Sequence, residues 1–119
     1  MMRRPITVAE TSAFARAAAK IWNEAELAEL VNYVALNPEA GDVIQGTGGV
    51  RKLRWSKTGS GKRGGTRVIY FYYNSGCPIY LLLAYAKSQA TDLTPEEKKA
   101  VVGFAAIIKS SADIGQGGM

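Results

Sequence analysis

Eight basic residues lie in one stretch of this chain that contains no acidic residue. Between Val43 and Thr91 there is neither aspartate nor glutamate, and the basic residues of the stretch are Arg51, Lys52, Arg54, Lys57, Lys62, Arg63, Arg67 and Lys87. The rest of the chain carries all ten acidic residues and is net negative. A basic region beside an acidic remainder is typical of proteins that meet a polyanion on one face. Nucleic acid, or another phosphate polymer, is therefore the first candidate ligand.

The residue types that are absent narrow the chemistry further. The chain has no histidine and a single cysteine, Cys77. Serine–histidine and cysteine–histidine nucleophile pairs are excluded, as are the histidine and cysteine ligand sets of zinc sites. Acid–base catalysis here would use lysine, tyrosine or carboxylate groups, with help from arginine. We expect neither a metal ion nor a cofactor.

The segment KTGSGKRGG, residues 57–65, combines glycine with basic residues as phosphate-binding loops do. The Walker pattern, however, needs a glycine where this chain has Ser56, and a serine or threonine where it has Arg63. That motif also needs a helix behind the loop, whereas strands are expected on both sides of this one. We interpret the segment as the glycine-rich tip of a β-hairpin, whose Lys57, Lys62 and Arg63 settle on a phosphate backbone.

Three strand patterns hold the remaining basic residues. Residues 50–57 alternate, with Lys52 and Arg54 on the side opposite Leu53 and Trp55. Residues 66–74 and 78–88 are rich in β-branched and aromatic side chains, which favour strands. If the three strands are neighbours, one sheet surface presents a cluster of phosphate-binding groups and an aromatic ring for stacking a base. Its members are Lys52, Arg54, Arg67, Tyr85 and Lys87.

Helical periodicity predicts the elements that must position this surface. A helix capped by Thr11 or Ser12 runs to Trp22, a second covers 24–38, and a third begins at the cap Thr94. In the third, the expected buried stripe is Ala100, Val101, Phe104, Ile107 and Ile108. With a short strand at 6–9, the order is β-α-α-β-β-β-α. This order predicts an α+β fold, with a helical hairpin and a C-terminal helix packed on one face of a small antiparallel sheet. The basic side chains would then point from the uncovered face or its rim.

Length and hydropathy indicate one domain over residues 1–119, with flexible ends at 1–4 and 111–119. The longest apolar run, Ile79–Ala86, is eight residues, far short of the roughly 20 that span a bilayer. With a single cysteine and no segment suited to a signal peptide, we expect a cytoplasmic protein that does not contact membranes.

Three segments together resemble a known family. The stretches GDVIQGTGGVRKLRW, GKRGGTRVIYFYY and IYLLLAYAKSQATDLTPEE, in this order, are similar to the RelE/ParE superfamily of bacterial type II toxins, and within it to the HigB-like branch. The resemblance is continuous from about residue 36 to residue 99. It implies a RelE-like fold and a ribosome-dependent messenger-RNA endonuclease that needs no metal ion. The cut would come from attack of a ribose 2′-hydroxyl on the adjacent phosphate.

The resemblance also implies roles for individual residues. Lys52, Arg54, Arg67 and Lys87 match catalytic positions of the family, whereas Arg51, Lys57, Lys62, Arg63 and Tyr85 would bind RNA. Members that cut RNA often carry a further arginine after the last lysine, where this chain has Ser88. Many also have a catalytic tyrosine or histidine near the C-terminus, and no tyrosine follows Tyr85 here. The group that deprotonates the 2′-hydroxyl stays open.

The resemblance implies partners as well, and two rival functions are carried beside the nuclease. The partners would be the ribosome, messenger RNA and a HigA-like antitoxin with a helix-turn-helix domain, through which alone operator DNA is bound. One rival is a ParE-like poison of DNA gyrase, which needs no catalytic site. The other is an RNA-binding module that uses the same surface without cutting.

Overall fold

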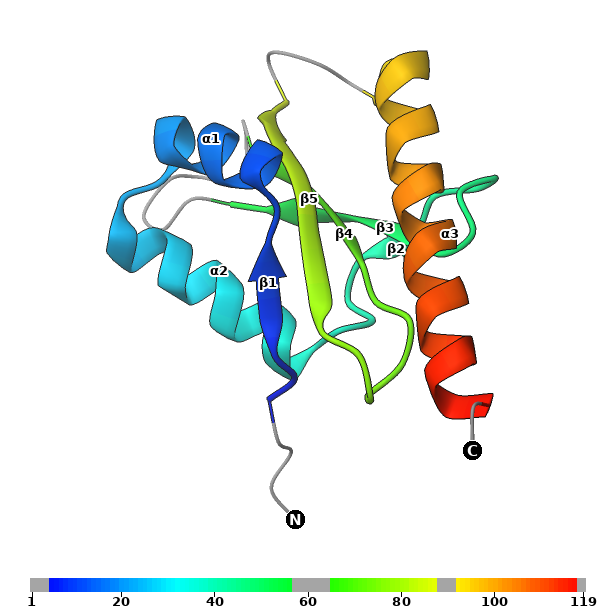
Figure 1. Ribbon diagram of the computed structural model, residues 1–119. Coiled ribbons are helices and arrows are strands. Elements are labelled where there is room, and N and C mark those ends of the chain that lie inside the picture. The colour runs from blue at the N-terminus through cyan, green and yellow to red at the C-terminus, as the bar shows by residue number, and fades with distance from the viewer. Residues whose placement is uncertain (1–4, 57–64, 88–91, 118–119) are drawn as a thin grey trace.

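The structure is a computed structural model that describes residues 5–56, 65–87 and 92–117 (Figure 1). The chain forms eight elements, in the order β1-α1-α2-β2-β3-β4-β5-α3. Their bounds are β1 Val8–Glu10, α1 Ser12–Ile21, α2 Glu24–Leu36, β2 Asp42–Val43, β3 Val50–Trp55, β4 Thr66–Phe71, β5 Ile79–Ala86 and α3 Pro95–Gly117. The predicted α+β class and element order are confirmed, with β2 as an addition.

One mixed, five-stranded sheet organises the fold, in the strand order β1-β5-β4-β3-β2. The central strands β3, β4 and β5 are antiparallel neighbours, as predicted, and β2 extends the antiparallel part. At the other edge β1 is parallel to β5. The sheet is therefore not purely antiparallel. Between β1 at one edge and β2 at the other, the chain crosses the sheet through α1 and α2.

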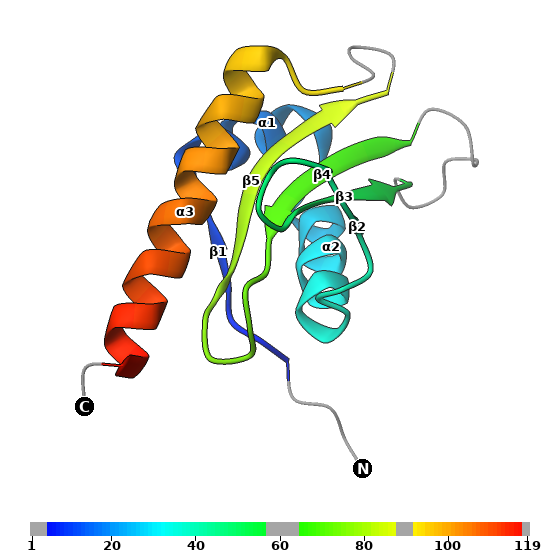
Figure 2. The same ribbon diagram turned by 90° about the vertical axis from the view of Figure 1, so that its right-hand side faces the viewer.

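Helices cover both faces of the sheet, which corrects the prediction that all of them share one face. Figures 1 and 2 show α1 and α2 on one side of the sheet and α3 on the other. Val68 and Tyr70 of β4 pack under α1 and α2, whereas Ile69 and Phe71 pack under α3. Because side chains alternate along a strand, a strand that is apolar at every position needs cover on both faces.

The helix starts follow from local side-chain chemistry. The Thr11 hydroxyl accepts a hydrogen bond from the Phe14 N–H and so caps α1. For α3, the Thr94 hydroxyl accepts from the Glu97 N–H, while a Glu97 carboxylate oxygen accepts from the Thr94 N–H. This reciprocal pair confirms the predicted cap of the last helix. The helix then continues to Gly117, through most of the segment expected to form a flexible end.

The buried stripe of α3 differs from its prediction in two members. Val101 and Ala105 are buried, and Phe104 and Ile108 pack against the same apolar cluster. Ile107, predicted to be buried, is 65% exposed, and Ala100 is exposed as well. Two further contacts attach the second half of α3 to the segment that follows β4 and to the turn before β3. The Tyr73 hydroxyl donates to Asp113 over 2.6 Å, and the Lys109 ammonium donates to the Gly48 carbonyl over 3.0 Å.

Candidate functional site

Two arginines and a tyrosine form one row across the central strands. Arg54 of β3 lies directly opposite Arg67 of β4, and Arg67 lies directly opposite Tyr85 of β5. Their strand parity is that of Val50, Ile69 and Leu83, which belong to the apolar cluster under α3. The row therefore lies on the face that α3 shares, near the end of the sheet where β5 finishes and α3 begins (Figure 2). The basic side chains were expected on a face free of helices or at the rim of that face. The face carries α3, and the row lies at its rim.

Neither arginine of this row is neutralised by a carboxylate in the described part of the chain. The ion pairs found there join Arg51 to Glu39 and Lys52 to Asp92. Like charges directly opposite each other on neighbouring strands are destabilising. A protein keeps such a pair where an anion outside the chain compensates the charge, and features of this kind mark functional sites.

Lys52 lies on the same face, two residues before Arg54. Its ammonium is 3.3 Å from a carboxylate oxygen of Asp92, just before the cap of α3. The Lys52 side chain is 32% exposed and that of Asp92 is 79% exposed. The pair thus joins the middle of β3 to the start of α3, and brings a carboxylate to the edge of the basic cluster.

Lys87 follows β5 at the same end of the sheet. Its N–H donates to the Gly65 carbonyl over 3.1 Å, which holds the strand ends together beyond Ala86, and its side chain is exposed. A shallow cavity of about 400 Å³ borders the row on the side of β2, lined by Ala40, Asp42, Lys52, Leu53, Arg54 and Arg67. Three of its six lining residues are basic, so a phosphate group suits it.

Tyr85 is held differently from the basic residues. Its ring is half-buried and packs against the apolar cluster under α3. Its hydroxyl oxygen is buried and has no hydrogen-bond partner. Burial, followed by the negative charge of Asp92, raises the pKa of this hydroxyl above its ordinary value, although Arg67 acts in the opposite direction. The stacking role of Tyr85 stays a prediction, but its buried hydroxyl is not placed to exchange protons with solvent.

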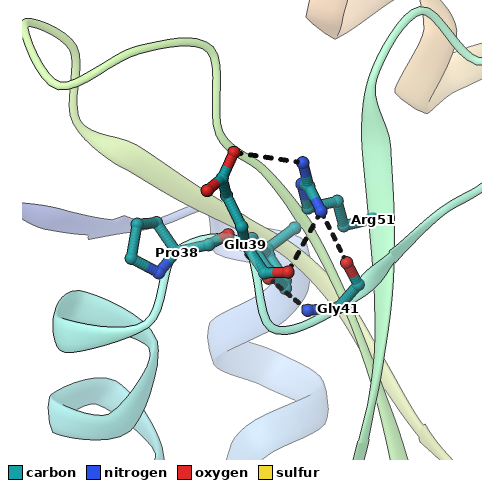
Figure 3. Close-up of polar contacts among 5 residues, drawn as sticks. Pro38, Glu39, Gly41 and Arg51 are labelled. Atoms are coloured by element: carbon teal, nitrogen blue, oxygen red, sulfur yellow. Dashed lines mark hydrogen bonds and ion pairs between the residues drawn. The ribbon is translucent and has the colours of Figure 1, made fainter.

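Arg51 is separated from the cluster by strand alternation. Figure 3 shows its guanidinium turned toward the loop after α2. It donates to the Gly41 carbonyl over 2.7 Å and to the Glu39 carbonyl over 3.2 Å, and it lies 3.9 Å from the Glu39 carboxylate. The same loop is bound by the Tyr70 hydroxyl, which donates to the Pro38 carbonyl and accepts from the Gly41 N–H, each over 2.8 Å. Arg51 is therefore a loop-binding residue and does not join Lys52 and Arg54.

Of the nine predicted site residues, the structure brings together Lys52, Arg54, Arg67 and Tyr85, with Lys87 at the same end of the sheet. Lys57, Lys62 and Arg63 lie outside the described residues. The segment that contains them does join adjacent antiparallel strands, since Trp55 lies opposite Thr66. The predicted hairpin is thereby confirmed.

Sequence reasoning missed Asp92. The signal was present, because Asp92 is the first acidic residue after the acid-free stretch and stands two positions before the predicted helix cap Thr94. What the sequence could not give is the contact with Lys52, forty positions earlier. Within the described residues, no group of three or more histidine, cysteine, aspartate or glutamate side chains could hold a metal ion. In the same part of the chain, no helix is long and apolar enough to cross a membrane.

Comparison with known protein families gives a match over nearly the whole chain. A family model described as the RelE toxin of the RelE / RelB toxin-antitoxin system matches residues 6–114. The matched region runs from two residues before β1 into the last turns of α3, and so includes the whole sheet and the basic row on it.

Proposed function

Since this chain belongs to the RelE toxin family and is thereby the toxin of a toxin-antitoxin system, we propose that it cuts messenger RNA on the ribosome. The reaction is attack of a ribose 2′-hydroxyl on the adjacent phosphate, which leaves a cyclic phosphate and a free 5′-hydroxyl. This reaction needs no group from outside the RNA as nucleophile. The protein has to hold the phosphate, stabilise its additional negative charge in the transition state and move two protons.

The observation that carries the proposal is the opposed pair Arg54 and Arg67, without a carboxylate partner among the described residues. Guanidinium groups bind phosphate oxygens through paired hydrogen bonds, and they stay charged throughout the physiological range. Two of them on adjacent strands form a fixed fork for the phosphorane, whose charge grows as the 2′-oxygen adds. Lys52 and Lys87 add positive charge at the two ends of this fork.

A ribosome-programmed cleavage assay tests the function. The purified chain is expected to cut messenger RNA on ribosomes, and Arg67→Ala is expected to reduce the rate by a factor of about 10²–10³, as for loss of one transition-state donor. Arg16→Ala is the matched control, because Arg16 is exposed on α1, on the far face of the sheet. Inhibition of gyrase supercoiling without cuts would identify a gyrase poison instead. RNA binding without cuts would identify a non-catalytic module.

We further propose that the antitoxin is HigA-like, with a helix-turn-helix domain, and that it is encoded beside the toxin. Membership of the family supports an antitoxin partner, and the HigB-like branch assigned by resemblance supports this type. The pair would act in the cytoplasm and bind operator DNA through the antitoxin. Growth of cells that express the chain, with and without the neighbouring gene, tests the partner. Arrest that the neighbour does not relieve counts against it.

A further inference from the structure

Transfer of the 2′-hydroxyl proton needs an acceptor, and this chain has no histidine to provide one. The basic row does not provide one either. Arginine keeps its proton in proteins. Lys52 is the cationic member of an ion pair, so it is a proton donor at rest. The Tyr85 hydroxyl is buried, without a partner, and it holds its proton more tightly than an ordinary tyrosine does. We therefore consider the carboxylates that reach the row.

Three carboxylates come near this end of the sheet, and their surroundings differ. Glu97 is occupied, because an oxygen of its carboxylate accepts the hydrogen bond that caps α3. Asp42 lies opposite Lys52 in the register of β2 and β3 and lines the cavity. Asp92 is exposed, touches the Lys52 ammonium, and is close enough to Tyr85 to raise the pKa of its hydroxyl. Asp92 thus reaches both β3 and β5, the strands on either side of Arg67.

From this geometry we infer that Asp92 is the proton acceptor of the cleavage reaction, an assignment that rests on the proposed nuclease function. The Asp92 carboxylate takes the proton of the 2′-hydroxyl as the bond from the 2′-oxygen to phosphorus forms. The bond from phosphorus to the 5′-oxygen then breaks, and the Lys52 ammonium gives a proton to that leaving oxygen. The products are a 2′,3′-cyclic phosphate and a 5′-hydroxyl, and no group is oxidised or reduced.

The 3.3 Å contact explains how the site returns to its starting state. After cleavage, Asp92 carries a proton and Lys52 has lost one. The two groups are within hydrogen-bond distance, so the carboxylic acid passes its proton directly to the amine, and the ion pair forms again. No proton has to be drawn from solvent. Lys52 and Asp92 therefore act as one unit, and removal of either partner stops the cycle.

The Asp92 carboxylate contacts the Lys52 ammonium of β3 and, like Arg67 and Glu97, is close enough to act on the Tyr85 hydroxyl. The acceptor works only as the carboxylate. The wild-type cleavage rate is therefore expected to fall as acid protonates Asp92, and a variant without this group should lack that fall.

The test uses the full chain with programmed ribosomes under single-turnover conditions, so that the rate reports the chemical step. Asp92→Asn keeps the size of the side chain and can still accept a hydrogen bond from Lys52, but it cannot take up a proton. We expect a rate loss of at least about a hundredfold, the lower end for general acid–base catalysis, and loss of the acid limb of the pH profile. Asp92→Glu keeps the carboxylate and should retain part of the rate. Glu24→Gln, with the same change of charge on α2, should behave as wild type.

Each result decides the assignment. A wild-type rate in Asp92→Asn, or tighter RNA binding without slower cleavage, shows that Asp92 repels RNA or serves the fold, and the inference is then wrong. If the acid limb of the pH profile is lost in Asp42→Asn instead, Asp42 is the proton acceptor. If the wild-type chain does not cut messenger RNA, and wild type and Asp92→Asn melt at the same temperature, the nuclease function itself has failed. The inference then fails with it.

Discussion

At the residue scale, Arg51, Lys52 and Arg54 show how strand alternation separates neighbours in sequence. The even-numbered pair faces α3 and the opposed Arg67, whereas Arg51 faces the other way and binds the loop after α2. Strand parity placed Lys52 and Arg54 on one surface without Arg51, whereas the family resemblance implied that Arg51 binds RNA. Side-chain type does not reveal that Arg51 has a carbonyl partner ten positions away.

Arg51→Gln is therefore expected to destabilise the protein without weakening its interaction with RNA. The loss removes hydrogen bonds from a largely buried guanidinium to two backbone carbonyls, so the free energy of unfolding should fall by about 1.5–3 kcal/mol. Arg54→Gln should leave this free energy within about 0.5 kcal/mol, since Arg54 is exposed. Denaturant unfolding of both variants measures this difference. A stability loss in Arg54→Gln that matched that of Arg51→Gln would contradict the separation of roles.

At the element scale, the sequence predicted helices and strands well where a pattern is local. Alternation in β3 and the cap at Thr94 are properties of a few consecutive residues, and both predictions are confirmed. Two elements escaped prediction for physical reasons. β2 has two residues, too few to show a period, and it exists because β3 offers an edge. The position of α3 depends on the need to cover the second face of strands that are apolar on both faces. No single segment of the sequence specifies which helix covers which face.

The face of α3 that packs on the sheet can be tested with a matched pair of substitutions. Val101→Ala removes buried methyl groups from the cluster with Val50 and Ile69, so the free energy of unfolding should fall by about 2 kcal/mol. Ile107→Ala removes a larger side chain that is 65% exposed, and its effect should stay within about 0.5 kcal/mol. Thermal and denaturant melts compare the two. If Ile107→Ala cost as much as Val101→Ala, α3 would be turned from the orientation described.

At the scale of the whole molecule, the clustered basic groups lie on one side of the sheet. The face shared with α3 carries Lys52, Arg54 and Arg67, with Lys87 at its end. The far side is covered by α1 and α2, and the first turn of α2 contains Glu24 and Glu26. An RNA strand approaching such a cluster is oriented by its field before any contact forms.

This clustering predicts how salt affects the binding of single-stranded RNA. Four basic groups that each neutralise a phosphate should give a slope of about −3 in a plot of log affinity against log salt concentration. Arg54→Gln/Arg67→Gln removes two of them and should make the slope less steep by about 1.4. Arg16→Gln/Lys20→Gln removes the same charge from exposed positions of α1, so it should lower affinity slightly and leave the slope unchanged. Fluorescence anisotropy with a short labelled RNA gives both slopes. If the two double variants changed the slope equally, net charge would govern binding in place of a defined face.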